Sequence, residues 1–479
     1  MNPVVRTLLS CLACAALPTT AFAAGYDTPV LYSARHMGMG GTAIGYVDDP
    51  SSIFHNPAGL EGVARGAVLA NLSPIMAKIH GSPSDHVVTG ADGKTSRPGL
   101  NIWSETAISP AFLVAAGYRL IDRVAVGFSV YPVASAGGRY TYATNKGKEV
   151  VEVSDYTRLV FIDYAPAVSV RLSSDLSLGL AWRYSTAQFQ RKRSNPDAIG
   201  TPSNVDLDMK GSNLEGFRLG LQWRHKDFSA GAVYRARTDT EVTTDSGMLE
   251  NTKGKNIKYA FVLPAKFGFG FQYRGVTDLR LAFDAEYTQQ SDNDSTALAG
   301  TGVAGEAPNT VEFPVSVPNI SKWNDNFTLR FGAAYKLGGV EARAGYLLDG
   351  AASQPKYVSA FGTPPTETHS FTIGAGYQVS DSLDVSLAGA YRTGKTTVRE
   401  DEVKGNGCPF CGKAGEYEIA VYGGYLDVCW RFGQAAKAPA AAPLPAPAAG
   451  APAVDAAPAA SPRAIARSPR GSSAAPINL

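Results

Sequence analysis

The residues of this chain whose types and spacing suit chemistry do not assemble into a catalytic or metal-binding motif. Cys408 and Cys411 have the CxxC spacing of redox motifs, but no strand–helix–strand pattern surrounds them, so we expect a local disulfide across an exposed loop. The run GMGGTA from Gly38 fits a loose dinucleotide fingerprint, yet it follows no strand and opens no such unit. The six histidines have no metal-ligand spacing, and no Ser-His-Asp arrangement can be argued. We therefore predict no catalytic residues, no metal, no cofactor and no enzymatic activity.

Arginines at regular spacing are the other residues that could do chemistry, because they could hold an anion. They belong to segments in which apolar and polar residues alternate. In FRLGLQWR, residues 217–224, the apolar side chains occupy the odd positions, and arginine, glycine and glutamine occupy the even ones. The segment NFTLRFGAAYK, residues 326–336, has the same pattern. Such alternation is typical of β-strands with one apolar and one polar face.

The number, length and charge of these strands indicate a membrane barrel. Strands of about nine to fifteen residues suit a tilted crossing of a bilayer. A face rich in charges suits a lumen, with the apolar face turned to lipid, and in lipid such strands must close. Short turns alternate with long connections, as in outer-membrane barrels. We predict an all-β fold, a 14-stranded antiparallel transmembrane β-barrel, with strands near 65–79, 108–119, 123–133, 157–172, 176–190, 213–225, 228–240, 257–273, 278–290, 324–336, 340–350, 366–379, 383–393 and 416–432.

The two ends of the chain have other compositions. Residues 1–23 read as a signal peptide, with Arg6, a short apolar core and the small-residue cleavage site Ala21-Phe22-Ala23. The barrel is expected over residues 65–432, and residues 433–479 form an Ala/Pro-rich tail that we expect to be disordered and periplasmic. The net charge of +2 gives no electrostatic case for nucleic acid.

The stretch between the signal and the first strand, residues 24–64, contains SARHMGMGGTAIGYVDDPSSIFHNPAGLEG. It resembles the N-terminal hatch of the FadL family of outer-membrane transporters for long-chain fatty acids and other hydrophobic compounds. The resemblance lies in Ser-Ala-Arg before Gly-Met-Gly-Gly, in the Asp48-Asp49 pair and in Asn56-Pro57-Ala58-Gly59, and it continues through the later strands. It implies a barrel whose lumen is plugged by a small hatch, with Asn56, Pro57, Ala58 and Gly59 in the part that moves.

The resemblance also implies that ligand leaves sideways, through a gap at a kinked third strand. In this chain that strand, RVAVGFSVYPVASAGG, contains Pro132, Gly137 and Gly138. Proline removes a donor from the strand ladder, so either the strand breaks locally there or Pro132 ends it at the loop. A lumen arginine could hold a carboxylate head by charge-assisted hydrogen bonds, and the candidates are Arg183, Arg235, Arg330 and Arg343.

The function that these features favour is passive, hatch-gated uptake of long-chain fatty acids or other hydrophobic molecules through the outer membrane, with lateral exit into the lipid. The expected partners are that small molecule and outer-membrane lipid, and the expected state is a monomer. An adhesin or surface antigen acting through the loops at 291–323 and 394–415 is the alternative. A general porin is a third reading, but a hatch would block ion flow.

Overall fold

The structure is a computed structural model that describes residues 32–82, 88–89, 95–96, 102–146, 149–196, 202–249, 252–305, 308–359, 362, 364–408 and 411–433. The chain divides into two units, Met1–Gln434 and Ala435–Leu479, and the second lies wholly outside the described residues. The predicted signal peptide, residues 24–31 and the predicted tail beyond Gly433 also lie outside them. None of the helices in the described part of the chain is long and apolar enough to cross a membrane.

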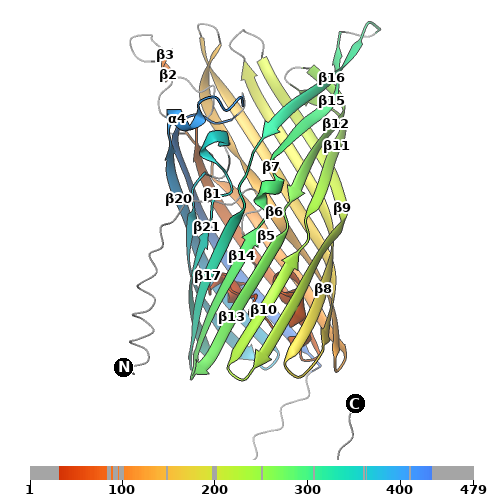
Figure 1. The fold of residues 1–479 in the computed structure, drawn as a ribbon, viewed down its shortest axis with the longest axis vertical. Coiled ribbons are helices and arrows are strands. Elements are labelled where there is room, and N and C mark those ends of the chain that lie inside the picture. The colour runs from red at the N-terminus through yellow and green to blue at the C-terminus, as the bar shows by residue number, and fades with distance from the viewer. Residues whose placement is uncertain are drawn as a thin grey trace, which may run out of the picture. The chain divides into compact units, whose positions relative to one another are not determined.

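Fourteen antiparallel strands close into a barrel, as predicted (Figure 1). The first and last strands pair from Gly66 with Phe432 to His80 with Glu418, which completes the ring. The strands of the ring are β1 (Gly66–Gly81), β5 (Ala107–Ile121), β6 (Val124–Lys146), β7 (Glu149–Arg171), β8 (Leu176–Pro196), β9 (Pro202–His225), β10 (Phe228–Arg235), β13 (Lys266–Val276), β14 (Leu279–Thr288), β17 (Asn326–Leu337), β18 (Val340–Asp349), β19 (Thr368–Ser380), β20 (Leu383–Val398) and β21 (Gly415–Phe432).

The apolar face of the strands points outward. In β13 the side chains of Phe267, Phe269 and Phe271 are each 47% exposed, whereas the positions between them are buried. A soluble sandwich would bury these rings in its core, so their exposure identifies the surface that contacts lipid.

The extracellular half of the wall departs from the prediction. The predicted strands 228–240 and 257–273 are each broken, the first between β10 and β11 (Thr238–Leu249) and the second between β12 (Thr252–Leu263) and β13. The break in the second follows from Pro264, which has no N–H to donate. The predicted loop 291–323 contains instead a hairpin of β15 (Ser295–Ala304) and β16 (Val311–Ile320).

The remaining elements are short. β2 (Val88–Thr89) pairs with β3 (Thr95–Ser96), and β4 (Ile102–Trp103) pairs with the end of β1. The helical turns η2 (Gln290–Asp292), η3 (Pro355–Tyr357) and α4 (Glu400–Val403) lie in the connections that precede β15, β19 and β21.

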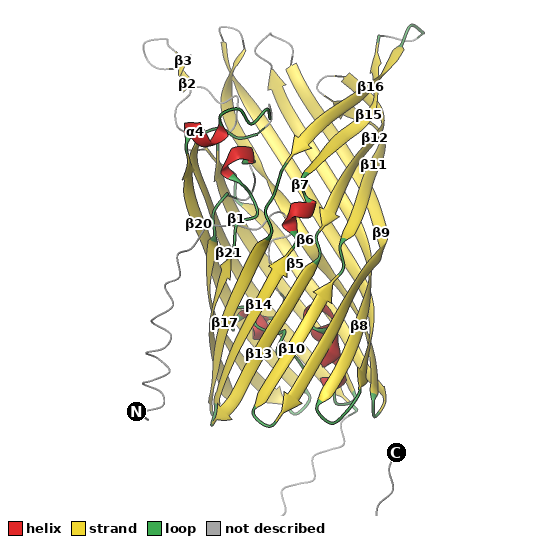
Figure 2. Cartoon of the chain, viewed as in Figure 1, coloured by secondary structure: helices red, strands yellow, loops and turns green. Residues whose placement is uncertain are grey.

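The hatch segment, residues 24–64 and described from Tyr32, lies inside the lumen. It contains α2 (Ala34–Met37), α3 (Ser52–His55) and η1 (Pro57–Gly62), which Figure 2 shows as red turns within the lower part of the barrel. The turn η1 packs against β7, β8 and β9, and α2 packs against β19, β20 and β21. Nearly every described residue of this segment is buried, so it fills the lumen and does not leave it open to water.

Candidate functional site

The Asn56-Pro57 pair forms the turn that fixes the hatch segment to the wall. The Asn56 carboxamide oxygen accepts from the Ala58 N–H at 3.2 Å and so caps η1, whose first residue is Pro57. The carboxamide nitrogen donates to the carbonyl of Ile44 at 2.9 Å and to that of Leu221 on β9 at 3.0 Å. One side chain therefore joins two parts of the hatch segment to each other and to the barrel.

Glycines on the inner face of the strands let the hatch backbone approach the wall closely. A Cβ on Gly179 would lie 2.2 Å from the carbonyl carbon of Pro57, and one on Gly231 would lie 1.9 Å from the carbonyl oxygen of Ile44. A Cβ on Gly220 would lie 2.1 Å from the Asn56 side-chain oxygen. Other wall glycines that meet the hatch backbone within 3.0 Å are Gly270, Gly332, Gly345 and Gly374. We call these seven glycines the glycine track.

Carboxylates of the wall accept the main-chain N–H groups that the hatch leaves free. Asp284 of β14 accepts from Ala43 at 2.8 Å and from Ile44 at 2.9 Å. Asp427 of β21 accepts from the Arg35 N–H at 3.1 Å and also from the Ser33 hydroxyl at 2.7 Å. Since unpaired main-chain donors are costly when buried, these contacts allow a segment with little regular structure to stay inside the barrel.

At its periplasmic end the hatch segment is held by ion pairs. The Glu61 carboxylate pairs with Arg171 of β7, whose Nε donates at 2.7 Å, and with Arg224 of β9. Arg119 of β5 donates from its Nε to the carbonyl of Val63 at 3.0 Å.

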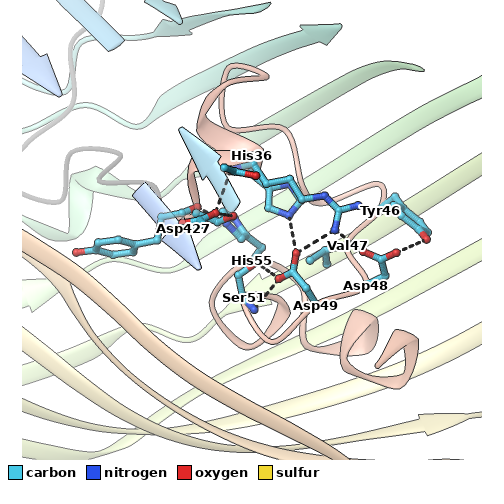
Figure 3. A network of polar contacts seen from close by, with 12 residues as sticks. His36, Tyr46, Val47, Asp48, Asp49, Ser51, His55 and Asp427 are labelled. Atoms are coloured by element: carbon cyan, nitrogen blue, oxygen red, sulfur yellow. Dashed lines mark hydrogen bonds and ion pairs between the residues drawn. The ribbon is translucent and has the colours of Figure 1, made fainter. Parts of the chain in front are cut away.

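Charged side chains also hold the hatch segment together internally (Figure 3). Arg35 Nη1 lies 2.7 Å from Asp48 Oδ1 and 3.1 Å from Asp49 Oδ2, and the Ser51 N–H donates to Asp49 at 2.9 Å. Burial alone would raise the pKa of the Asp49 carboxyl, but His36, Arg35 and Ser51 together hold it well below its usual value. The carboxylate therefore stays charged, and the network persists in mild acid.

The surroundings of His55 favour its neutral form, whereas those of Asp49 favour the charged form. Its Nε2 donates to the carbonyl of Tyr32 at 2.8 Å, and its ring lies 4.9 Å from that of His36. Burial, with a smaller contribution from His36, holds the pKa of His55 well below its usual value. The ring is thus neutral in the seated hatch.

A cavity of about 880 Å³ lies above the hatch segment, with Tyr32 and Met37 in its floor. Aromatic and aliphatic side chains from many strands form most of its wall, among them Leu159, Phe189, Leu207, Tyr259 and Phe261. Arginines also reach it, and most of them are paired: Arg191 with Asp155 at 2.7 Å and Arg392 with Asp349 at 2.9 Å.

The cavity opens sideways between β5 and β6. Pairing of these strands ends at Val114 with Val130. The next main-chain contact that the described residues make across this seam is from the Glu105 N–H to the Arg139 carbonyl, at 2.8 Å. At this seam the cavity is lined by Ile108, whose side chain is exposed, as well as by buried residues.

Pro132, Gly137 and Gly138 all lie in the cavity wall beside this seam. β6 does not end at Pro132: its register with β7 shifts by one residue between Pro132 and Ala134, and the strand continues to Lys146. Gly137 has a φ of 137°, and a Cβ there would lie 2.1 Å from the Thr157 carbonyl oxygen. Only glycine fits this conformation without strain.

Tyr32 connects the hatch segment to this irregular stretch, and sequence reasoning missed it. Its hydroxyl donates to the Pro132 carbonyl at 2.6 Å, and its ring packs edge-on against Phe54, at 5.1 Å between centroids. Phe54 in turn packs against Tyr131. A tyrosine nine residues into the expected mature chain carries no signal of such a contact.

The four arginines predicted as head-group contacts do not line the cavity; the structure places them on the lumen wall, buried and already bonded. Arg183 pairs with Asp163 at 2.6 Å, Arg330 with Glu286 at 3.2 Å and Arg343 with Glu341 at 2.7 Å, and Arg235 donates to the Pro264 carbonyl at 2.8 Å. Their face was predicted correctly. The partners of Arg183 and Arg330 lie on neighbouring strands, β7 and β14, and alternation alone cannot identify them.

Cys408 and Cys411 are joined in a disulfide in the extracellular segment before β21. The described residues contain no group of three or more histidine, cysteine or acidic side chains that could hold a metal ion.

A closed fourteen-stranded barrel with an apolar outer face and a filled lumen is an outer-membrane channel protein. The chain belongs to the outer membrane protein transport family (OMPP1/FadL/TodX), whose model matches residues 14–421. The resemblance to this family, the fold and the outer-membrane location predicted from the sequence are thus confirmed, and members of the family are transport channels for hydrophobic compounds.

Solved structures share the fold at low sequence identity. A Pseudomonas aeruginosa FadL homologue is 16% identical, with 85% of this chain and 100% of that chain covered and a TM-score of 0.62. The P. putida toluene transporter TodX is 15% identical, with coverages of 84% and 99% and a TM-score of 0.62. The Ralstonia pickettii toluene transporter TbuX is 15% identical, with coverages of 84% and 98% and a TM-score of 0.57. Comparison with curated proteins finds no significant match.

Proposed function

We propose that this protein carries long-chain fatty acids passively across the outer membrane, with the hatch segment as the gate and the β5–β6 seam as the exit. The observation that supports this proposal is the cavity, which is apolar, closed below by the hatch and continuous with the seam. Its volume of about 880 Å³ suits a large ligand. Each methylene that leaves water there gains about 0.8 kcal/mol, so the cavity can extract an aliphatic chain from dilute solution.

Arg158 of β7 is the proposed partner of the carboxylate head. Its side chain is exposed, lines the cavity beside Gly137, and forms no ion pair with any described residue. The other arginines that line the cavity already have acidic partners: Arg139, Arg191, Arg193 and Arg392. A free guanidinium beside an apolar cavity fits an amphiphile with an anionic head.

The hatch responds to ligand through Tyr32 in this proposal. A chain that fills the cavity presses on Tyr32 and Met37 in the floor, and displacement of Tyr32 breaks its hydrogen bond to Pro132. That loosens the stretch of β6 at the seam, and the ligand leaves sideways into outer-membrane lipid. Lipid is the favourable destination for an apolar chain, so no energy source is needed.

Monoaromatic hydrocarbons are the second candidate ligands, because two of the similar structures are named toluene transporters and aromatic rings line part of the cavity. Toluene has no charge, so Arg158 separates the two candidates.

The test is uptake of radiolabelled palmitate and toluene by cells that lack their own transporters. Arg158→Ala removes a charge-assisted hydrogen bond, so we expect the KM for palmitate to rise about tenfold with toluene unchanged. Lys192→Ala, an exposed charge on β8 outside the cavity wall, is the matched control. Deletion of residues 51–60 from the hatch should abolish gated uptake while the barrel still assembles. Uptake of toluene alone would overturn the fatty acid assignment, and uptake of neither by well-assembled protein would favour the adhesin reading.

A further inference from the structure

In one sector of the extracellular wall, the strands on the two sides, β16 and the end of β20, are not paired with each other. In the described part of the chain β16 pairs only with β15, and the end of β20 from Gly394 onward pairs only with β21. β18 and β19 stop lower down, where Asp349 pairs with Thr368. The connection after Asp349, which we call the strap (residues 350–359), lies in this sector.

The lower half of the strap is bonded to the connection between β16 and β17. The Gly350 N–H donates to the Phe327 carbonyl at 2.9 Å, and the Ala352 carbonyl accepts from Asn324 at 2.8 Å. Ala351 and Ala352 are buried. This half is therefore fixed to the ring itself.

The upper half of the strap contacts the segment that carries the disulfide, residues 399–408 and 411–414, which we call the clasp. The Gly412 N–H donates to the Val358 carbonyl at 2.7 Å, and Cys411 pairs with Ser359 in an isolated bridge. Cys411 Sγ also lies 3.8 Å from the Ile320 carbonyl oxygen at the end of β16. At the disulfide, the clasp and the strap thus lie beside the end of β16, on the side of this strand that faces away from β15.

Two glycines of the clasp lie in open space, and Val403 is the clasp residue that packs against the buried cluster of Val358, Val398 and Tyr417. Gly405 and Gly407 have φ values of 68° and 64°, and neither would bring a Cβ within 4 Å of another atom. The disulfide closes the ring at Cys408 and Cys411 and so restricts the residues that pair with the strap. At its other end the clasp is tied to β1, where the Lys413 N–H donates to the Ser82 carbonyl at 3.0 Å.

The inner side of this assembly is part of the cavity wall. Ser353 and Ser359 of the strap line the cavity, together with Gly362 beyond it and Asn319 and Trp323 across the sector. We propose that the disulfide-bearing clasp fixes the strap as one wall of the cavity mouth, and that this wall limits the width of the molecules that enter. This inference rests on the proposed function, since it assigns a selecting element to the same cavity.

The experiment compares a slender ligand with a wide one. Cells producing the wild type, Cys408→Ser/Cys411→Ser or Cys429→Ser are given radiolabelled palmitate or a fatty acid that carries a pyrene ring. Cys429 is a buried thiol on β21 outside the clasp, and its variant is the matched control. Loss of the two main-chain contacts at Val358 and Ser359 should raise uptake of the pyrene fatty acid about tenfold and leave palmitate unchanged.

A second variant and a second measurement distinguish failure of this inference from failure of the proposed function. Asn406→Ala keeps the disulfide but removes the bond from Asn406 to the Lys356 carbonyl and the one it accepts from Cys408, so a smaller change in the same direction is expected. Trypsin cleavage after Lys356 should also become faster in both variants. Equal uptake of the pyrene fatty acid by wild type and double variant would overturn the inference alone. Absence of all uptake by the wild type would overturn the proposed function, and unchanged trypsin cleavage would show that the clasp does not hold the strap.

Discussion

The contact between Gly231 of β10 and the hatch segment gives the sharpest test of how the hatch is seated. A Cβ at Gly231 would lie 1.9 Å from the Ile44 carbonyl oxygen and 2.8 Å from the Asn56 side-chain nitrogen. Cβ contacts below 3.0 Å essentially never occur, so Gly231→Ala must move the hatch backbone by at least 1.1 Å, from 1.9 to 3.0 Å. The strand cannot retreat instead, because it is paired on both sides with β9 and β13.

The energetic cost follows from what such a shift disturbs. Asn56 holds Ile44 at 2.9 Å and Leu221 at 3.0 Å, and a shift of 1.1 Å puts both bonds out of range. Two neutral hydrogen bonds contribute about 2 kcal/mol together, in the range of 1–3 kcal/mol that overpacking usually costs. The population of unseated hatch should therefore rise about thirtyfold.

Conductance of the purified protein in planar bilayers measures this population, because only an unseated hatch leaves an aqueous path. Gly231→Ala should open far more often than the wild type. Gly389→Ala on β20, where no atom lies within 4 Å of the new Cβ, makes the same change without the contact and should behave as the wild type. The reasoning is refuted if the two variants, both with intact heat-modifiable barrels, conduct alike.

Two further predictions concern how the hatch segment is held in the barrel. Because burial holds the pKa of His55 well below its usual value, the seated hatch favours the neutral ring, and this stabilisation is present above about pH 6.5 and lost as the pH falls below it. Conductance should therefore rise from pH 7 to pH 5, and His55→Gln should flatten that rise; a profile unchanged by the substitution would contradict the prediction. Glu61→Gln weakens the pairs to Arg171 and Arg224 by about 1 kcal/mol, since both arginines are partly exposed, so amide hydrogen exchange in η1 should quicken about fivefold, while exchange in α2 at the far side of the hatch should not change.

Alternation along the strands was enough to predict the barrel, because lipid on one side and the filled lumen on the other impose a period of two. It failed where that contrast is absent. Residues 311–320 do alternate apolar side chains with polar ones and prolines, but Pro314 and Pro318 each remove a ladder donor, and in the structure most residues on both faces of β16 are exposed. This strand was therefore predicted as part of a loop. The break between β12 and β13 was missed for the opposite reason, since the pattern resumes directly after Pro264 and Ala265.

The candidate site was predictable only as far as local sequence determines it. Asn56 caps the turn η1, which begins at Pro57, so this turn could be predicted from the local sequence. Arg183 and Asp163 lie 20 residues apart, and only the register of β7 with β8 brings them together. For this reason the burial of the arginines on the inner face could be predicted from the sequence but their ion-pair partners could not, and their contact with a ligand stays a prediction.

Neither the lipid outside the barrel nor water inside it would explain why the residues of the glycine track are glycines. A glycine inside a strand weakens it, because it packs no side chain and loses more entropy on folding. A lumen filled with water would not need glycine, since any small polar side chain would serve there. The hatch backbone does need it, because the wall must pass within contact distance of the main chain at Ile44, Pro57 and Gly40. The plug is thus seated largely through main-chain contacts along the track, with a few carboxylates such as Asp284 as fixed points. The gating proposed above then requires release of this segment alone, while the lower part of the ring, from β1 paired with β21 and β5 onward, stays closed.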